Sequence, residues 1–371
     1  TKATPPVTPP PPGLGELFLP KLITVLREGY TLTHLRSDAI AGLTVAIVAL
    51  PLSMAIAIAA GASPAQGIIT AIIGGFLVSL LGGSRVQIGG PTGAFIVVVF
   101  GVIAEHGYDG LVLATFMAGI IMLVAGYLRA GNLVAFVPEA VINGFTIGIG
   151  IIIATSQIKD LFGLSVAQVP AEFIPKIDAL WAARDTLTVH ALGIGLATMV
   201  LIVVLRWLAP KFPGLIIAVG LTSAVVAVAT LPVDTIFSRF GDLPHTLPMP
   251  SLPAISLEKV LELLPSAFVI AFLASVESLL SAMVADQMIG GHHRPNAEVL
   301  AQGFANIGSA FFGGLPATGA IARTATNVRA GGKTPVSGIV HALTILLVML
   351  LAAPLAGYLA MPALAGLLIL T

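Results

Sequence analysis

Apolar runs of about twenty residues recur along almost the whole chain, and they restrict what it can fold into. A helix that crosses the ~30 Å hydrocarbon core of a bilayer needs about 20 such residues. Only 9% of the residues are charged and 57% are hydrophobic, so one water-exposed globule could not cover this much apolar surface. We therefore expect an all-α polytopic membrane protein. Its candidate spans are 39–60, 64–82, 87–104, 110–128, 132–157, 187–208, 213–231, 263–285, 298–312, 315–328, 335–352 and 354–371.

The basic residues predict the orientation of these spans. With the N-terminus in the cytoplasm and alternating loops, eleven basic residues fall on the inner side, five on the outer side, and Arg323 lies within a span. This asymmetry follows the positive-inside rule, which predicts a multi-pass protein of the cell inner membrane with a cytoplasmic N-terminus. The inner residues are Lys2, Lys21, Arg27, Arg36, Arg85, Arg129, Arg206, Lys211, Arg294, Arg329 and Lys333, and the outer residues are Lys159, Lys176, Arg184, Arg239 and Lys259.

The two ends of the sequence differ from its middle. The first residues, TKATPPVTPPPPG, are proline-rich and lack the basic-then-apolar layout of a signal peptide, so 1–38 is expected to be a cytoplasmic segment. The last residues, ALAGLLILT, stop within an apolar run, which predicts that the native chain continues.

Two of the apolar runs are interrupted by nearly the same residues. Residues 89–94 read GGPTGA and residues 313–320 read GGLPATGA. Glycine and proline oppose a continuous helix, so we expect an extended lead-in to about the midplane, followed by a half-helix. The half-helices are predicted to run from Thr92 to Ile103 and from Ala317 to Asn327, each starting beside its proline. In the alternating topology they enter from opposite sides, as in the inverted repeats of secondary transporters.

Two half-helix N-termini facing each other would form an anion site at the midplane. Each N-terminus offers N–H groups without helical partners and about half a positive charge. Gly93 and Gly319 would let a ligand approach the backbone, and Thr92 and Thr318 would add hydroxyl donors. The alternative is that these glycines and prolines only allow helix packing and kinks. The repetition of the pattern in opposed topology favours the anion site.

Two charged residues lie deep within the predicted spans, where charge is costly and usually functional. Glu277 is near the middle of span 263–285, where burial favours a neutral carboxyl, as proton coupling requires; alternatively it forms an ion pair with Arg323. Arg323, ~9 Å along the second half-helix, either adds positive charge to the anion site or extends to the cytoplasmic surface. Gln302 and Asn306, one turn apart, either line the site or bond between helices.

Nothing in the sequence predicts catalysis, a cofactor, a metal site or a nucleic-acid partner. The chain contains no cysteine, and its formal net charge is zero. RAGGKTP resembles the end of a phosphate-binding loop, but Asn327 stands where that motif requires glycine. No Ser/His pair or carboxylate pair lies at one depth, and every histidine except His341 lies near a polar segment or a span end. We therefore do not expect an enzyme.

One long segment resembles a known family. Residues 275–338 read SVESLLSAMVADQMIGGHHRPNAEVLAQGFANIGSAFFGGLPATGAIARTATNVRAGGKTPVSG, which closely resembles the SulP family of sulfate-permease-like anion transporters, related to mammalian solute carrier family twenty-six. Further matches are GLTVAIVALPLSMAIAIAAGASP, GGPTGAF and GFTIGIGIIIATSQIKDLFG. The resemblance implies fourteen spans in two inverted sevens, with a core domain at 39–130 and 255–352 and a gate domain at 131–254 and 353–371. The final gate spans and a STAS domain are expected beyond this sequence.

The resemblance also implies a set of site residues between the half-helices. Many relatives have glutamine where Leu52 stands and serine where Ala322 stands, so the pocket is expected to be less polar here. Glu277 matches the acid that handles the coupling cation in related transporters. The implied substrate-binding residues are Leu52, Ile56, Thr92, Gly93, Ala94, Phe95, Thr318, Gly319, Ala320, Ile321 and Ala322, with Arg323 added by the reasoning above.

These observations predict a secondary active transporter that carries a small carboxylate or inorganic anion together with a proton, by elevator-type alternating access. Coupling to Na⁺ is less favoured. One alternative is an anion channel or exchanger on the same fold, and a current above carrier rates would identify a channel. Another is a nucleobase transporter with the same crossed half-helices, and the uninterrupted SulP segments favour the SulP family over it. Expected partners are the anion, the proton, the lipid bilayer and a second copy of the chain, joined through gate spans and the STAS domain.

Overall fold

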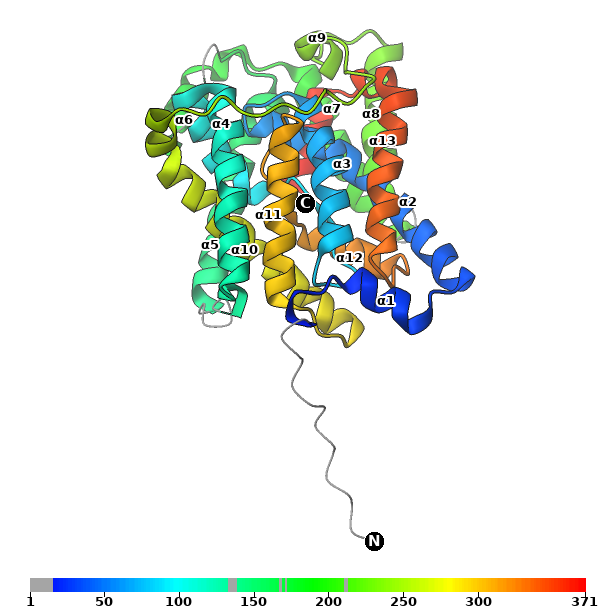
Figure 1. Ribbon diagram of the computed structural model, residues 1–371. Coiled ribbons are helices and arrows are strands. Elements are labelled where there is room, and N and C mark those ends of the chain that lie inside the picture. Colours follow the sequence, from blue (N-terminus) through cyan, green and yellow to red (C-terminus); the bar gives the residue numbers. More distant parts are fainter. Residues whose placement is uncertain (1–15, 133–138, 167–168, 171, 210–212) are drawn as a thin grey trace.

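The computed structural model describes residues 16–132, 139–166, 169–170, 172–209 and 213–371 (Figure 1). In these ranges, six helices are long and apolar enough to cross a membrane. They are α2 (Leu32–Ala59), α3 (Pro64–Leu81), η2 with α4 (Gly93–Phe95 and Ile96–Tyr127), α7 (Val189–Leu208), α10 (Leu257–Ile289) and α13 (Val336–Gly357).

Other helices complete the set of predicted spans. Four of them match candidate spans, namely α5 (Glu139–Phe162), α8 (Gly214–Val228), α11 (Pro295–Phe311) and α14 (Met361–Ile369). A fifth, α12 (Ile321–Arg329), is the second half-helix. The remaining elements lie outside the candidate spans and are η1 (Glu16–Phe18), α1 (Lys21–Gly29), α6 (Phe173–Ala182), η4 (Arg184–Thr186) and α9 (Ile236–Phe240).

Several predicted boundaries were wrong for local reasons. Helix α2 begins seven residues before 39, at Leu32, because the Thr31 hydroxyl accepts a bond from the backbone N–H of His34 at 3.3 Å and caps the helix there. Segment 1–38 therefore includes α1 and the start of α2. Helix α10 extends back to Leu257 and accommodates Pro265. Spans 87–104 and 110–128 follow each other closely, separated by Gly107 with φ 70°.

The lead-ins to the two half-helices pair with each other as a short antiparallel sheet. Strand β1 (Gly89–Gly90) pairs with β2 (Thr318–Gly319), with Gly89 opposite Gly319. The backbone stays extended through Ala320, whose N–H donates to Ile88 O at 2.8 Å. The second half-helix therefore begins at Ile321, four residues later than the predicted Ala317. Both Pro91 and Pro316 lie in extended chain rather than in a first helical turn.

Side chains from the surrounding helices form hydrogen bonds with the backbone N–H and carbonyl groups of the second lead-in. Asn306 of α11 bonds Ala317 in both directions, accepting from its N–H at 3.0 Å and donating to its carbonyl at 2.7 Å. The hydroxyl of Thr70 accepts from the N–H of Leu315 at 2.7 Å. Non-helical backbone at membrane depth requires such internal partners because no water is available there. Asn306 thus links α11 to the second lead-in. Of its two sequence-based alternatives, this is closer to bonding between helices than to lining the site.

The first lead-in is held in the same way. Thr324 of α12 accepts from the N–H of Ile88 at 3.1 Å, and Asn327 donates to Val86 O at 2.8 Å. The buried carboxylate of Glu298 accepts from the N–H of Gly83 at 2.8 Å. These bonds join the two broken segments into one rigid unit.

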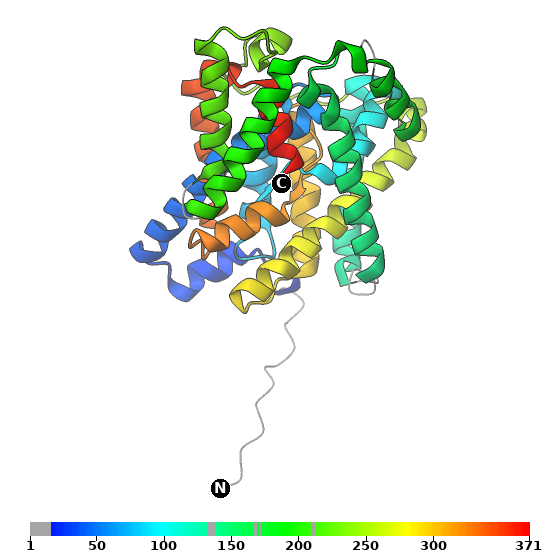
Figure 2. The ribbon, with the colours of Figure 1, turned by 180° about the vertical axis from the view of Figure 1, so that it is seen from behind.

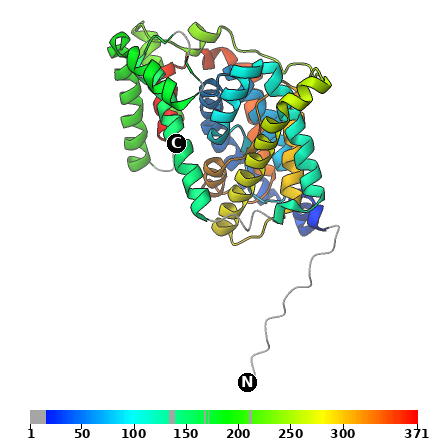
Figure 3. The same cartoon turned by 90° about the vertical axis from the view of Figure 1, so that its left-hand side faces the viewer.

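The helices pack in two groups. The first contains α2, α3, α4, α10, α11, α12 and α13, and the second contains α5, α7, α8 and α14. Figure 3 shows the second group, green and red, on the left of the first. From behind, α7, α8 and α14 lie side by side (Figure 2).

The basic residues assigned to opposite sides lie at opposite ends of the molecule. At the α1 end, Arg85 pairs with Glu28 at 2.5 Å, and Arg294 donates to Thr24 at 2.7 Å. At the other end, near α6 and α9 in Figure 1, Arg239 pairs with Asp160 at 2.7 Å. This placement agrees with the alternating topology. Lys2 and Lys211 lie outside the described residues.

Candidate functional site

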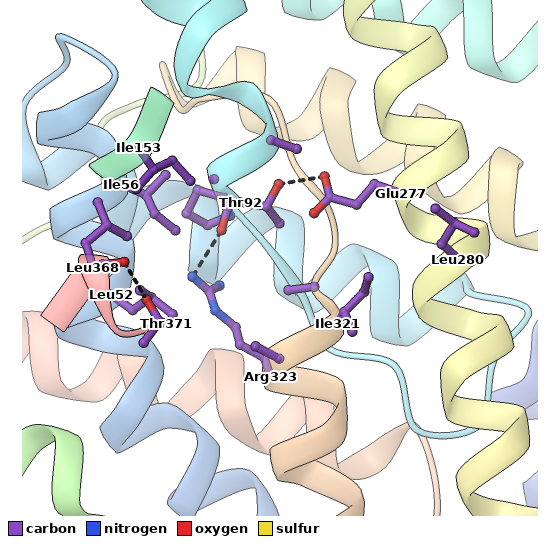
Figure 4. Close-up of a pocket in the computed structure, with 15 residues that line it drawn as sticks. Leu52, Ile56, Thr92, Ile153, Glu277, Leu280, Ile321, Arg323, Leu368 and Thr371 are labelled. Atoms are coloured by element: carbon purple, nitrogen blue, oxygen red, sulfur yellow. Dashed lines mark hydrogen bonds between the residues drawn. The ribbon is translucent and has the colours of Figure 1, made fainter. Parts of the chain in front are cut away.

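A cavity of about 360 Å³ lies where the two half-helices begin (Figure 4). Neither half-helix has a side-chain cap at its N-terminus, at Thr92 and Ala320, so the first-turn N–H groups have no side-chain acceptor. The lining residues are Leu52, Ile56, Pro91, Thr92, Gly93, Ala94, Ile153, Glu277, Leu280, Ala320, Ile321, Ala322, Arg323, Leu368 and Thr371.

Ten of the thirteen predicted site residues line this cavity: Leu52, Ile56, Thr92, Gly93, Ala94, Glu277, Ala320, Ile321, Ala322 and Arg323. The other three, Phe95, Thr318 and Gly319, do not line it. Thr318 is a strand residue whose hydroxyl donates to Ala274 O at 2.9 Å, so it is not available as a ligand donor. Gly319 faces the side chain of Gln87. These two residues lie in strand β2 outside the cavity, because the helix starts later than the sequence suggested.

Glu277 reaches the cavity from α10. Its Oε2 accepts a hydrogen bond from the Thr92 hydroxyl at 2.8 Å, as Figure 4 shows. The acid therefore touches the first residue of one half-helix start. The hydroxyl expected to contact the anion is bonded to this carboxyl instead, so any change of charge at Glu277 acts directly on Thr92.

Arg323 is held inside the protein rather than at its surface. It is 2% exposed, and its Nη2 donates to Ser53 Oγ and to Pro91 O, both at 3.1 Å. Its Nη1 has no hydrogen-bond partner. Of the two alternatives left open for Arg323, the structure does not show extension to the cytoplasmic surface, because these acceptors hold the guanidinium beside the first half-helix. The alternative ion pair with Glu277 is not formed in this conformation.

A second cavity of about 760 Å³ continues from the first toward the α1 end. The two share Leu52, Ala322, Arg323 and Thr371. Arg206 and Arg329 also line the second cavity, and no acidic residue in the described part of the chain does. A path lined by three arginines attracts anions, because low-dielectric walls focus their field.

The chain was compared with known proteins. A model of the sulfate permease family matches residues 35–371. The chain belongs to this family. It is 43% identical over 343 residues to the putative sulfate transporter YvdB of Bacillus subtilis (strain 168), covering 92% of this chain and 64% of that protein. It is 30% identical over 347 residues to the bicarbonate transporter BicA of a Picosynechococcus species, covering 90% and 60%. The chain thus spans less than two thirds of these relatives.

Solved structures share the fold of this family member. The transmembrane domain of a cyanobacterial BicA matches with a TM-score of 0.82 at 29% identity, covering 92% of this chain and 88% of that one. SLC26A9 matches with a TM-score of 0.84 at 19% identity, covering 95% and 59%. The predicted all-α polytopic membrane fold and the SulP resemblance are confirmed. The family consists of membrane anion transporters, which agrees with the expectation that the chain is not an enzyme.

Five lining residues were not predicted. Ile153 of α5 and Leu368 and Thr371 near α14 come from the second helix group. Their contact with the half-helices depends on packing between distant segments, and no local pattern indicates it. Leu280 lies three residues after Glu277, so the helical period offered a signal for it. Pro91 was singled out as a helix start but not as a lining residue.

The position of Gly319, where the two lead-ins pair, leaves no room for a side chain. A Cβ at this position would overlap the side-chain amide of Gln87. Gly319→Ala is therefore expected to lower the free energy of unfolding by about 1–3 kcal/mol, the typical cost of overpacking. Thermal unfolding of the purified protein in detergent measures the change.

A double-mutant cycle tests the cause of this loss. Shortening the obstacle with Gln87→Ala should remove most of the Gly319→Ala penalty. Gly101→Ala is the control, since an added Cβ meets nothing within 4 Å there. Equal penalties for Gly319→Ala with and without Gln87 would contradict the close approach.

Proposed function

We propose that this chain forms part of a secondary active transporter that moves a small anion by alternating access. The supporting observation is the cavity between two uncapped half-helix starts, which places the buried Arg323 and the acid Glu277 against one volume. Helix N-termini and a guanidinium both favour a negative charge. The curated relatives named for sulfate and bicarbonate make an inorganic oxyanion the first substrate class to test, with small carboxylates next.

The arrangement of cavities favours a carrier over a channel. The central cavity joins the large cavity at the α1 end, whereas a third cavity at the opposite end shares no lining residue with it. A site open to one end fits alternating access. We assign α2–α4 and α10–α13 to a moving core and α5–α9 and α14 to a gate, with boundaries near 131, 255 and 353. The core supplies the half-helices and Glu277, while the gate supplies Ile153 and Leu368.

We further propose a cytoplasmic N-terminus in a bacterial inner membrane. In this orientation the large cavity with Arg206 and Arg329 opens to the cytoplasm, so the conformation is inward-facing. We also propose a homodimer in the full protein, with gate spans and a STAS domain at the contact.

The proton is the proposed coupling ion because the carboxyl of Glu277 faces the anion cavity.

Uptake into proteoliposomes tests the proposed function. Radiolabelled sulfate, bicarbonate, chloride, succinate and uracil are presented with and without an inward pH gradient. We expect at least one anion to accumulate about tenfold more with the gradient than without it, and uracil to show no uptake. An exchanger would instead require an internal anion, and a channel would carry current beyond carrier rates. Uptake of uracil alone would contradict the proposal and favour a nucleobase transporter.

A further inference from the structure

The third cavity, of about 210 Å³, lies at the end opposite α1 and is lined by both helix groups. Several times larger than the ~30 Å³ share of one water molecule, it has room for a small hydrated ion. Its charged lining residues are Lys159, Lys176, Arg239 and Asp160. Three positive charges and one negative charge leave the lining with an excess of two positive charges.

Lys176 of α6 has no acidic partner there. It is 5% exposed, and its ammonium donates one long bond, at 3.5 Å, to the Ser156 hydroxyl. The same ammonium lies 4.9 Å from the centre of the Phe100 ring. An ammonium carries three donors, so most of its bonding capacity is unused. Burial lowers the pKa of Lys176, because its charged form loses hydration.

The other basic residues differ in how they are neutralised. Arg239 pairs with Asp160 at 2.7 Å and with Asp234 at 2.9 Å. Lys159 donates to the carbonyl of Val166 at 3.3 Å. Among the described residues, neither Lys159 nor Lys176 forms an ion pair. The positive excess therefore belongs to the two lysines on α5 and α6.

The cavity continues the line of the transport path. Ile56 of α2 lines the central cavity, and Ile58 lines the third one. On α5, Ile153 lines the central cavity and Ser156 the third. Phe100 lies on the half-helix that starts at the central cavity, about 9 Å beyond Ala94. The two cavities are thus separated by less than two helical turns along each of the same three helices.

We propose that this third cavity is a second anion-binding site, which takes a small oxyanion such as sulfate on Lys176 and Lys159, beside Ser156, before it enters the central cavity. An anion there supplies the acceptors that the Lys176 ammonium lacks. Phe100 of the core packs against Lys176 of the gate, so movement of the core changes access to the ammonium. This role deepens the proposed transport function and rests on it, but binding at this site does not require transport.

A single cysteine tests the site directly, because the sequence contains none. Ser156→Cys places a thiol beside Lys176, and its rates of modification by an anionic and a cationic methanethiosulfonate are measured in detergent. We expect the anionic reagent to react about tenfold faster, since two nearby positive charges favour it. Sulfate at millimolar concentration should slow both reactions by occupying the cavity.

Two further substitutions in the Ser156→Cys background decide the role of Lys176. Lys176→Met removes the charge and keeps the length, and it should abolish both the rate difference and the protection by sulfate. Lys259→Met is the matched control, because it removes one positive charge from an exposed basic residue assigned to the same outer side but outside the cavity. It should leave both measurements unchanged.

Three results would contradict the proposal that the third cavity binds an anion. These are equal rates for the two reagents, protection by sulfate that survives Lys176→Met, or a thiol that neither reagent reaches. Uptake of anions, measured separately, distinguishes this failure from failure of the proposed function. Protection without any anion uptake would leave the site in place and overturn the transport role.

Discussion

Proteoliposomes carrying Glu277→Gln are expected to lose uptake driven by a pH gradient while the protein still binds its anion. Glutamine keeps an oxygen that can accept the Thr92 bond of 2.8 Å seen for Glu277. It also imitates a protonated carboxyl that cannot release its proton. Because the side chain lines the anion cavity, an ionised Glu277 would repel an incoming anion. At ~6 Å and an effective dielectric constant of ~20, that repulsion is roughly 3 kcal/mol.

This repulsion predicts cooperative binding of anion and proton. Protonation removes the cost, so each ligand strengthens binding of the other by the same factor, up to about a hundredfold for ~3 kcal/mol. In Glu277→Gln, anion affinity should become independent of pH, and gradient-driven uptake should fall by at least about tenfold. Titration calorimetry over a range of pH and uptake with imposed gradients measure the two effects.

Glu298→Gln is the matched control for this experiment. It makes the same change in another buried carboxyl of the same helix group, which contacts Gly83, Ser278 and Gln302 rather than the cavity. We expect it to lower thermal stability and to preserve the pH dependence of uptake. If folded Glu277→Gln takes up anion under a pH gradient like the unmodified protein, Glu277 is not the coupling residue.

The sequence predicted the parts of the fold that depend on local patterns. Apolar length identified the helices, and the repeated GGPTGA and GGLPATGA identified the two breaks. Of the cavity residues on the half-helix starts, Thr92 and Gly93 followed from those breaks, whereas Ala94, Ala320, Ile321 and Ala322 were implied by the family resemblance. Thr318 and Gly319 were misplaced because the extent of the extended lead-in is set by pairing with Gly89 and Gly90, which are over two hundred residues earlier.

Helix α11 carries polar residues at helical spacing, and two of them, Gln302 and Asn306, were considered in the sequence analysis. Glu298, Gln302 and Asn306 recur every four residues on a helix whose other polar side chains are Asn296 and Ser309, and this spacing places the three on one face. In the structure they are buried and bond to Gly83, Ser278 and Ala317. The sequence left open whether Gln302 and Asn306 line the site or bond between helices, and Glu298 was not singled out from it. The backbone groups that Glu298 and Asn306 satisfy belong to the two broken segments. Those partners follow only from the tertiary arrangement.

Arg323→Met is expected to weaken anion binding by about tenfold to a hundredfold. The guanidinium lines both the central cavity and the cavity that leads to it, and its Nη1 has no hydrogen-bond partner. Loss of one charge at ~6 Å in a medium of effective dielectric constant ~20 corresponds to roughly 3 kcal/mol, which is reduced by counterions in the open cavity. Calorimetric titration with the transported anion at low and high salt measures the loss, which should be smaller at high salt.

Thermal stability separates a binding role from a structural one. Arg323 is a buried charge that forms no ion pair within the described chain, and replacing such a charge with an apolar side chain is often neutral or stabilising. We therefore expect Arg323→Met to unfold at the same temperature or higher. Arg36→Met, at an exposed residue of α2 that lines none of the three cavities, is the control and should change affinity by less than about threefold, since solvent screens its charge. If Arg323→Met instead destabilises the protein while the folded fraction binds anion normally, the guanidinium serves to hold Pro91 and Ser53 in place and the anion is bound by the helix N-termini alone.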